Sequence, residues 1–315
     1  MAIALPLDSL SFLVGANAAY LGVVALLLVV CFNAKQQPRF RGLANSAVLR
    51  NIIAAYNVVC ITLAAAVVVM LVQYKLARWR ADTNGDESHA VCTKANMANG
   101  DGAPLVNAMW LFYGQKFWEY LDTVFFILKG SRRQVSFLHV YHHCSVTAIV
   151  WVYLQLMTST NDGGTQLVTA DGYIPAFLNS FVHVLLYSHY FMRLKCKHVG
   201  GAKPWWAPYL TKMQLVQFFI IAFAVACAML LPRCECVHAC AVCLLPIASP
   251  FFRRRSTALA QLRGLTRSPL SRRRYPMWTK KLVGGYMATM IFLFGQFYIK
   301  KYRSGRAKQP KKRAA

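Results

Sequence analysis

Residues 116–143 read KFWEYLDTVFFILKGSRRQVSFLHVYHH. The first half is an apolar stretch that carries Lys116, Glu119 and Asp122. The second half, after a short basic turn, is another apolar stretch and carries three histidines. Ionisable residues are costly inside a membrane and mark functional sites when they occur there. These residues therefore predict two consecutive membrane helices that share a functional polar face.

The composition of the whole chain agrees with a membrane protein. Of its 315 residues, 57% are hydrophobic and 15% are charged, whereas soluble domains carry about 25% charged residues. Lys and Arg number 36 against 10 Asp and Glu, for a net charge of +26. In a soluble protein this basicity would suggest nucleic acid, but in an apolar chain it more often marks the ends of membrane spans. The composition disfavours an ordinary soluble domain, a disordered chain and a nucleic acid partner.

Apolar stretches of about 20 residues are long enough to cross a bilayer as helices. Seven of them are found, at 9–34, 51–74, 105–128, 134–157, 173–192, 209–231 and 282–299. The sequence therefore predicts one all-α membrane domain over 1–315, with seven transmembrane helices and short loops.

The distribution of charge predicts the orientation of these spans. The loops after the first, third and fifth spans are basic, whereas those after the second and fourth are balanced or acidic. Cytoplasmic loops carry an excess of Lys and Arg. We therefore expect the N-terminus outside the cytosol and the C-terminus, with its basic tail at 300–315, in the cytosol.

Residues 232–281 break this pattern, because they are strongly basic but fall on the non-cytosolic side. Three explanations stay open from the sequence: a luminal loop, an extra partial span, or an error in the sequence.

Polar residues recur at helical spacing on four consecutive predicted spans. They are Lys116, Glu119 and Asp122; His139, His142 and His143; Asn179, His183 and Tyr187; and Thr211, Gln214 and Gln217. Residues three or four positions apart lie on one face of a helix. We therefore expect four polar faces that enclose one polar chamber. For the three charged residues of the third span, a structural ion-pair network is an equally good explanation.

Clustered histidines allow two kinds of chemistry. A membrane di-iron desaturase or hydroxylase binds its metals with several histidine boxes, and only one cluster here has that spacing. A metal-free acyl transfer needs a histidine as nucleophile or base, with amide or imidazole donors to stabilise an oxyanion. We favour acyl transfer without metal or cofactor. The di-iron enzyme is the alternative, and a seven-helix receptor or transporter is the non-enzymatic one.

The motifs and their order resemble the ELO family of very-long-chain fatty acid elongases, the 3-ketoacyl-CoA synthases of the endoplasmic reticulum. Residues 116–143 match the family's KxxExxDT and HxxHH boxes. NSFVHVLLYSHY at 179–190 matches NxxxHxxMYxYY, with Leu186 for Met and His189 for Tyr. TKMQLVQ at 211–217 matches TxxQxxQ.

The resemblance covers about residues 10–231 and, weakly, the last span, and it fails across 232–281. Within the family, Gln134 and the sequence QVSFLHVYHH are most similar to the polyunsaturated fatty acid elongases of lower eukaryotes.

The resemblance implies that helices two to seven surround a narrow acyl tunnel in the endoplasmic reticulum membrane. It implies condensation of acyl-CoA with malonyl-CoA to a 3-ketoacyl-CoA, with release of CoA and carbon dioxide. The partners that it implies are the lipid bilayer and the 3-ketoacyl-CoA reductase, dehydratase and enoyl reductase of the elongation cycle. The oligomeric state is left open, a homo-oligomer included.

Our hypothesis for the reaction gives His142 the role of nucleophile. His139 or His143 would orient it or deprotonate, and His183 would help to hold the thioester oxygen or the malonyl group. A ternary complex in which the histidines act only as bases is the alternative. Supporting polar roles fall to Lys116, Glu119, Asp122, Asn179, Tyr187, Gln214 and Gln217.

A basic mouth for the anionic CoA head is expected at the cytosolic loops. It would consist of Arg132, Arg133, Arg193, Lys195, Lys197 and Lys203. Arg pairs well with phosphate, although ordinary positive-inside charge would place many of these residues there in any case.

Cysteines in the predicted luminal loops allow a disulfide, because that compartment is oxidising. The candidate joins Cys92 to Cys234 or Cys236, and we favour it over a zinc site because the cysteine spacings fit zinc poorly. The tail ends QPKKRAA, which is close to the dilysine retrieval signals of the endoplasmic reticulum.

Overall fold

The computed structural model describes residues 6–33, 38–83, 94–96, 103–158, 167–169, 172–196, 205–206, 209–230 and 277–306. Within these ranges the chain is helical apart from two short strands. The elements are η1 (Pro6–Asp8), α1 (Leu10–Asn33), α2 (Pro38–Asn45), α3 (Ala47–Thr83), β1 (Lys94–Asn96), α4 (Ala103–Trp118), α5 (Tyr120–Leu128), α6 (Phe137–Thr158), β2 (Leu167–Thr169), α7 (Tyr173–Cys196), α8 (Leu210–Leu230) and α11 (Met277–Arg306).

The all-α class is confirmed for the described residues, and each of the seven predicted spans lies on helix. The third span differs from the prediction, because it is divided into α4 and α5 at Glu119. The Glu119 backbone stays right-handed helical (φ −65, ψ −14), and its carbonyl accepts from the Asp122 amide at 3.1 Å. The interruption is therefore one tightened turn, located within the charged motif.

The last helix also differs from the prediction. It begins at Met277 rather than at 282, so the end of the doubtful segment 232–281 belongs to it, and it continues to Arg306 into the predicted tail. Lys280 and Lys281 lie on this helix, and the long stem of a lysine lets its charge reach water while the backbone remains helical. Residues 232–276 and 307–315 lie outside the described residues.

Three helices are long and apolar enough to cross a membrane: Leu10–Cys31, Ala47–Ala77 and Met277–Lys300. In α8 the apolar part is shorter, Leu210–Ala226. The polar residues that the sequence places on α6 and α7 lower their hydropathy, and α4 and α5 are each short. The seven-span count therefore rests on the sequence, and three spans have support from helix length and composition in the structure.

Large apolar side chains cover the outer faces of these helices. Leu26, Val48 and Phe292 are each more than 60% exposed. A soluble monomer rarely exposes contiguous apolar surface of this extent, whereas lipid tails would cover it. The chain is accordingly a membrane protein.

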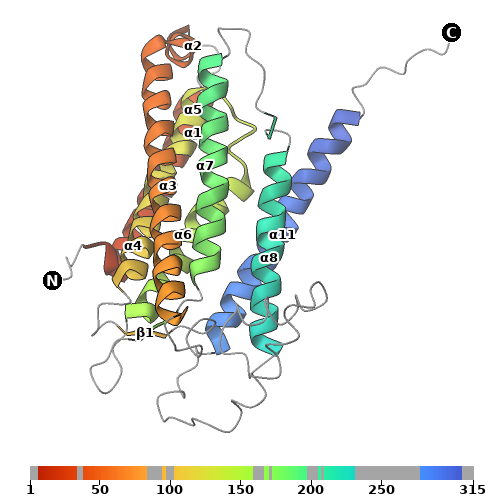
Figure 1. Cartoon of the computed structure of the whole chain (residues 1–315). Helices are drawn as coiled ribbons and strands as arrows, with labels where there is room; N and C mark the ends of the chain where they lie inside the picture. Colours follow the sequence, from red (N-terminus) through yellow and green to blue (C-terminus); the bar gives the residue numbers. More distant parts are fainter. Residues whose placement is uncertain are drawn as a thin grey trace.

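Successive long helices run in alternating directions, so the start of α1 and the end of α11 lie toward opposite ends of the molecule (Figure 1). α3 packs mainly against α7 and α4, and α8 packs mainly against α11. The main apolar core lies between α3, α4, α6, α7, α8 and α11, whereas α1 packs on α5 through a separate cluster around Tyr20 and Tyr120.

The strands β1 and β2 pair antiparallel, with Lys94 opposite Thr169 and Asn96 opposite Leu167. They come from the loops after the second and fourth predicted spans. The pairing brings those two loops together at one end of the helices, the end that the charge pattern assigns to the non-cytosolic side. The short helix α2 and this sheet were not predicted.

Candidate active site

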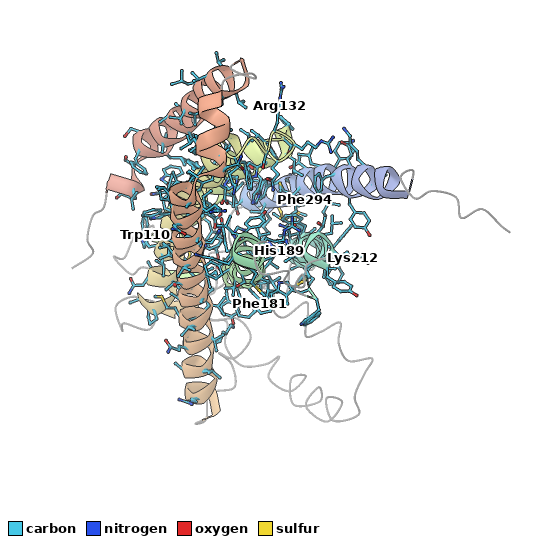
Figure 2. The ribbon with its side chains drawn as sticks, turned by 90° about the horizontal axis from the view of Figure 1, so that it is seen from above. Trp110, Arg132, Phe181, His189, Lys212 and Phe294 are labelled. Atoms are coloured by element: carbon cyan, nitrogen blue, oxygen red, sulfur yellow. The ribbon has the colours of Figure 1, made fainter. Side chains whose placement is uncertain are left out.

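The polar faces of four helices meet in one cavity of about 480 Å³, here called the polar cavity. Its lining combines the histidine group with amides and a few apolar side chains: Asp122, Phe126, Arg133, Gln134, Ser136, Leu138, His139, His142, His143, Asn179, Val182, His183, Leu186, His189, Tyr190, Leu210, Thr211, Gln214, Gln217, Phe218, Phe294 and Phe297. In the view from above, His189 of α7 and Phe294 of α11 lie near the middle of the bundle, whereas Arg132 lies at its edge (Figure 2). The structure therefore brings all four proposed catalytic histidines, Asn179 and both glutamines to one space.

A second cavity of about 140 Å³, here called the apolar cavity, adjoins the first. It is lined mainly by aliphatic and aromatic side chains of α4, α6, α7, α8 and α11. His142, Asn179, Gln217 and Phe218 line both cavities. Of the three histidines of the HxxHH box, here called the box histidines, His142 is thus the one that lies between a polar and an apolar space.

The apolar cavity extends to the point where α6 passes the start of α7. Tyr153 and Gly172 both line it there. A β-carbon at Gly172 would overlap the Tyr153 ring, so a larger residue there would displace that ring. Among the α6 residues that line the cavity, Tyr153 is the farthest from His142 along the helix.

The histidines of α6 are held by hydroxyl groups from other helices. His142 Nδ1 lies 3.2 Å from the Tyr286 hydroxyl on α11. His139 Nε2 lies 2.8 Å from Thr123 Oγ1 on α5, and Thr123 Oγ1 in turn lies 2.8 Å from the Tyr20 hydroxyl on α1. Helices at both ends of the sequence therefore contribute to the position of the histidine group.

His143 lies between the other two box histidines. Its ring centroid is 4.4 Å from that of His139 and 5.7 Å from that of His142. Its Nδ1 is buried, with no hydrogen-bond partner among the described residues. A buried ring nitrogen in this state is suited to an interaction with bound substrate.

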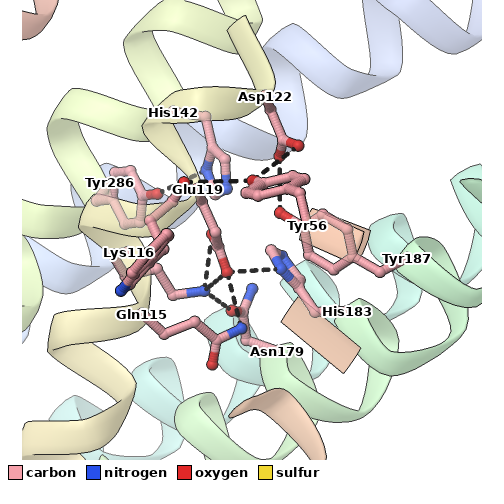
Figure 3. A network of polar contacts seen from close by, with 11 residues as sticks. Tyr56, Gln115, Lys116, Glu119, Asp122, His142, Asn179, His183, Tyr187 and Tyr286 are labelled. Carbon is pink, nitrogen blue, oxygen red and sulfur yellow. Dashed lines mark hydrogen bonds and ion pairs between the residues drawn. The ribbon is translucent and has the colours of Figure 1, made fainter. Parts of the chain in front are cut away.

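The charged residues of the third span form a network with α7 (Figure 3). Lys116 Nζ donates to Glu119 at 2.9 and 3.1 Å and to Asn179 Oδ1 at 2.7 Å. Gln115 Nε2 also donates to Glu119, at 3.0 Å. Lys116 and Glu119 are 0% exposed and line neither cavity. This geometry fits the structural ion-pair network considered for these residues.

Glu119 also approaches the histidine of the fifth span. Its Oε1 lies 2.9 Å from His183 Nδ1, although the approach is not aligned as a hydrogen bond. His183 lines the polar cavity, whereas Glu119 does not. Glu119 therefore connects the ion pair behind the cavity to a histidine that borders it.

Asp122 has separate partners. The Tyr187 hydroxyl donates to its Oδ2 at 2.7 Å, and the Tyr56 hydroxyl on α3 donates to its Oδ1 at 3.0 Å. This carboxylate therefore ties α5 to α3 and α7 at the rim of the polar cavity.

Four of the six residues of the predicted basic mouth belong to the described part of the chain. Arg132 and Arg133 between α5 and α6, and Arg193 and Lys195 at the end of α7, are exposed. Arg133 borders the polar cavity. Lys197 and Lys203 lie outside the described residues, as do Cys92, Cys234 and Cys236 of the disulfide prediction.

Among the described residues, no group of three or more His, Cys, Asp and Glu side chains is arranged to hold a metal ion. The box histidines instead contact hydroxyl groups and one another.

Three tyrosines of the site were missed from the sequence: Tyr20, Tyr56 and Tyr286. Tyrosines within apolar spans commonly serve as packing residues or interface anchors, and no spacing relates these three to the motifs. They become partners of Thr123, Asp122 and His142 only through the packing of helices that are distant in sequence.

Comparison with known proteins gives a consistent result. Residues 5–311 match the family ELO, described as the GNS1/SUR4 family. The chain is 29% identical over 213 residues to very long chain fatty acid elongase 5 of Xenopus tropicalis, a match that spans 67% of this chain and 54% of the relative.

Two mammalian proteins are similarly related. Very long chain fatty acid elongase 2 of Mus musculus is 29% identical over 258 residues, covering 81% of this chain and 67% of the relative. Very long chain fatty acid elongase 4 of Homo sapiens is 30% identical over 223 residues, covering 70% of this chain and 53% of the relative. The chain therefore matches between about half and two thirds of the length of these relatives.

Proposed function

The chain belongs to the GNS1/SUR4 (ELO) family, and on that premise we propose that it is the condensing enzyme of fatty acid elongation. It would join an acyl-CoA to two carbons of malonyl-CoA and release carbon dioxide and CoA. The relatives that it matches are named very long chain fatty acid elongases.

The observation that carries this proposal is the position of His142 between the two cavities. A fatty acyl thioester has an apolar chain and a polar, charged head, and its reacting carbon lies between them. The apolar cavity suits the chain, and the polar cavity suits the thioester and the malonyl group. Together they would form the tunnel that the resemblance implies, with the Tyr153 ring in the wall of the acyl part.

In the first half of the proposed reaction, a ring nitrogen of His142 attacks the thioester carbonyl carbon. The carbon–sulfur bond breaks, CoA leaves as the thiolate, and the acyl group remains on His142 as an acyl-imidazolium. Asn179 and Gln217 border both cavities at the same place as His142. Their side chains are suited to stabilise the oxyanion, because amide donors held in place act strongly on developing charge.

In the second half, malonyl-CoA loses carbon dioxide, and the electrons of the broken carbon–carbon bond form an enolate. The enolate attacks the acyl carbon, and the carbon–nitrogen bond to His142 breaks. The product is a 3-ketoacyl-CoA two carbons longer, and His142 is regenerated. No metal or redox group takes part in these steps.

The remaining polar residues have supporting roles in this proposal. His139 and His143 border the reacting group and would orient it, and His183 would contact the malonyl or thioester oxygen from α7. Lys116, Glu119, Asp122 and Tyr187 would fix α4, α5 and α7 to one another, as their mutual contacts indicate. Gln214 would complete the polar lining.

The CoA head would lie at the basic mouth of the polar cavity. Arg133 borders that cavity, and Arg132, Arg193 and Lys195 are exposed. Guanidinium groups pair with phosphate in two-point contacts. Lys197 and Lys203 would add to the same charge.

We place all seven predicted spans in the endoplasmic reticulum membrane, with the N-terminus luminal and the C-terminus cytosolic. The alternating helix directions and the three apolar helices support a membrane-spanning arrangement, and the alternation of basic and non-basic loops supports the orientation. Long-chain polyunsaturated acyl-CoA is the proposed substrate class. The proposed partners are the reductases and the dehydratase that complete the elongation cycle.

Expression of the full chain in an elongase-deficient host, supplied with a panel of fatty acids, tests the function. We expect products two carbons longer, preferentially from polyunsaturated acids, and none from a His142→Ala control made in equal amount. Unchanged lipid profiles with the native chain inserted in the membrane would overturn the proposal.

A further inference from the structure

Tyr286 on α11 lies beyond every motif that the sequence identified. Its side chain is 8% exposed and borders the apolar cavity. Its hydroxyl lies 3.2 Å from His142 Nδ1, and Figure 3 shows this contact beside the ion-pair network. Tyr286 Oη is therefore within hydrogen-bond distance of a His142 ring nitrogen.

The same two helices carry a second tyrosine hydroxyl that makes an interhelical contact. Tyr141 on α6 lies 3.0 Å from Thr289 Oγ1 on α11. Tyr141 is one residue from His142, yet it lines neither cavity. The α6–α11 interface therefore contains one hydroxyl contact that involves the reacting histidine and one that does not.

A histidine can attack a carbonyl only through a ring nitrogen with a free lone pair. In the neutral ring, one nitrogen carries hydrogen and the other has the lone pair, and the hydrogen bond of one nitrogen determines the state of the other. A hydroxyl group can accept from Nδ1–H. Tyr286 in that role would leave Nε2 unprotonated.

We propose that Tyr286 is a positioning residue that accepts a hydrogen bond from His142 Nδ1–H and so makes Nε2 the nucleophile. This inference rests on the proposed function. The Nε2 lone pair forms the bond to the acyl carbon, the carbon–sulfur bond breaks, and CoA departs with its electron pair. The Nδ1 proton stays in place, so the intermediate is an acyl-imidazolium and therefore a strong acyl donor. Transfer to the enolate returns the electron pair to Nε2.

This role explains a feature of the chain that the motifs do not. The last helix follows residues 232–276 and carries none of the family boxes. It nevertheless provides the hydroxyl that contacts His142. A truncated chain that kept every motif but lost α11 would lose the hydrogen-bond partner of His142 and part of the wall of both cavities.

The test compares Tyr286→Phe with Tyr141→Phe in the purified full-length protein. Both variants remove one hydroxyl from the α6–α11 interface and keep the ring. We expect Tyr286→Phe to lower kcat for condensation by about 10- to 100-fold with KM unchanged, the range expected when a reacting group is misoriented. We expect Tyr141→Phe to stay within about twofold of the native chain, because its hydroxyl is remote from both cavities.

The second readout is the rate of CoA release after mixing with acyl-CoA alone, which reports the first half of the reaction. The same fall in this rate is expected for Tyr286→Phe. An undiminished rate, a kcat within twofold of native, or an equal loss in Tyr141→Phe would overturn the inference. A native chain with no condensing activity would instead overturn the proposed function, so the two failures are distinguishable.

Discussion

Two groups of ionisable residues lie side by side in this protein and differ in what their polar atoms contact. Lys116 and Glu119 are fully buried, pair with each other and with Asn179 and Gln115, and line neither cavity. The box histidines all border the polar cavity. His139 and His142 each have one ring nitrogen in contact with a hydroxyl group of another helix.

This difference assigns a structural role to the ion pair and a chemical role to the histidines, although both belong to the segment 116–143. A charge that is satisfied by the protein itself has no capacity left for a substrate, and its value is in fixing the geometry of the helices that carry it. A ring nitrogen that borders a cavity is free for a reaction. Substitutions in the two groups should therefore fail in different ways, one by loss of folding and the other by loss of turnover.

The largest effect on turnover is expected from the histidine group. His142→Ala should lower the condensation rate by about 10³-fold or more, as removal of a catalytic nucleophile does, with little change in thermal stability. Condensation assays and thermal unfolding of the same purified preparation check both parts. The control is His189→Tyr, which introduces the residue of the family motif into the same cavity and should stay active.

The largest effect on stability is expected from the ion-pair network. Glu119→Gln leaves the Lys116 ammonium buried without its counter-charge, and loss of one partner of a buried pair costs about 3–5 kcal/mol. We expect a lower thermal midpoint and less folded protein in the membrane. Adding Lys116→Met should restore most of the stability, because an uncharged pair at these positions leaves no unpaired charge. A single variant as stable as the native chain would remove the distinction between the two groups.

A smaller effect is expected at the basic mouth. The double variant Arg132→Glu and Arg133→Glu should raise KM for the CoA substrates by on the order of 10-fold, because a like charge opposes the CoA phosphates. The chain length of the products should not change. Steady-state kinetics checks this, with Arg80→Glu on α3 as a control for charge reversal elsewhere on the chain. Equal KM values in both variants would mean that the arginines serve only the orientation of the spans.

The smallest effect concerns the contact from α1 to the histidine group. Tyr20→Phe removes the hydroxyl that supports Thr123, which in turn contacts His139. A loss of about twofold to fivefold in kcat is expected, since His139 is oriented rather than directly reacting. Tyr120→Phe is the control, because its hydroxyl contacts Asn17 and Thr147 at the same helix interface. An identical loss in both variants would indicate a packing effect.

The sequence predicted the helices and the shared polar cavity because both depend on periodicity. His142, Asn179 and Gln217 lie on stripes of 3.6-residue repeat, and the structure places all three on the boundary of both cavities. The ion-pair explanation of Lys116 and Glu119 was also available, because residues three apart share a helix face.

The missed features depend on which helices become neighbours. The hydroxyls of Tyr20 and Tyr286 reach the histidine group from α1 and α11, and no local spacing encodes those contacts. The tightened turn at Glu119 likewise has no signal in the local spacing of residues. The close approach of Gly172 to Tyr153 could not be predicted, because it depends on how α6 packs against the start of α7.

Mass spectrometry of the purified full-length protein after mixing with acyl-CoA alone tests the central claim most directly. We expect a mass increase equal to one acyl group, mapped to the peptide that contains His142 and lost when malonyl-CoA is added. A chain that condenses acyl-CoA with malonyl-CoA but carries no acyl group on His142 would contradict the nucleophilic role given to this residue.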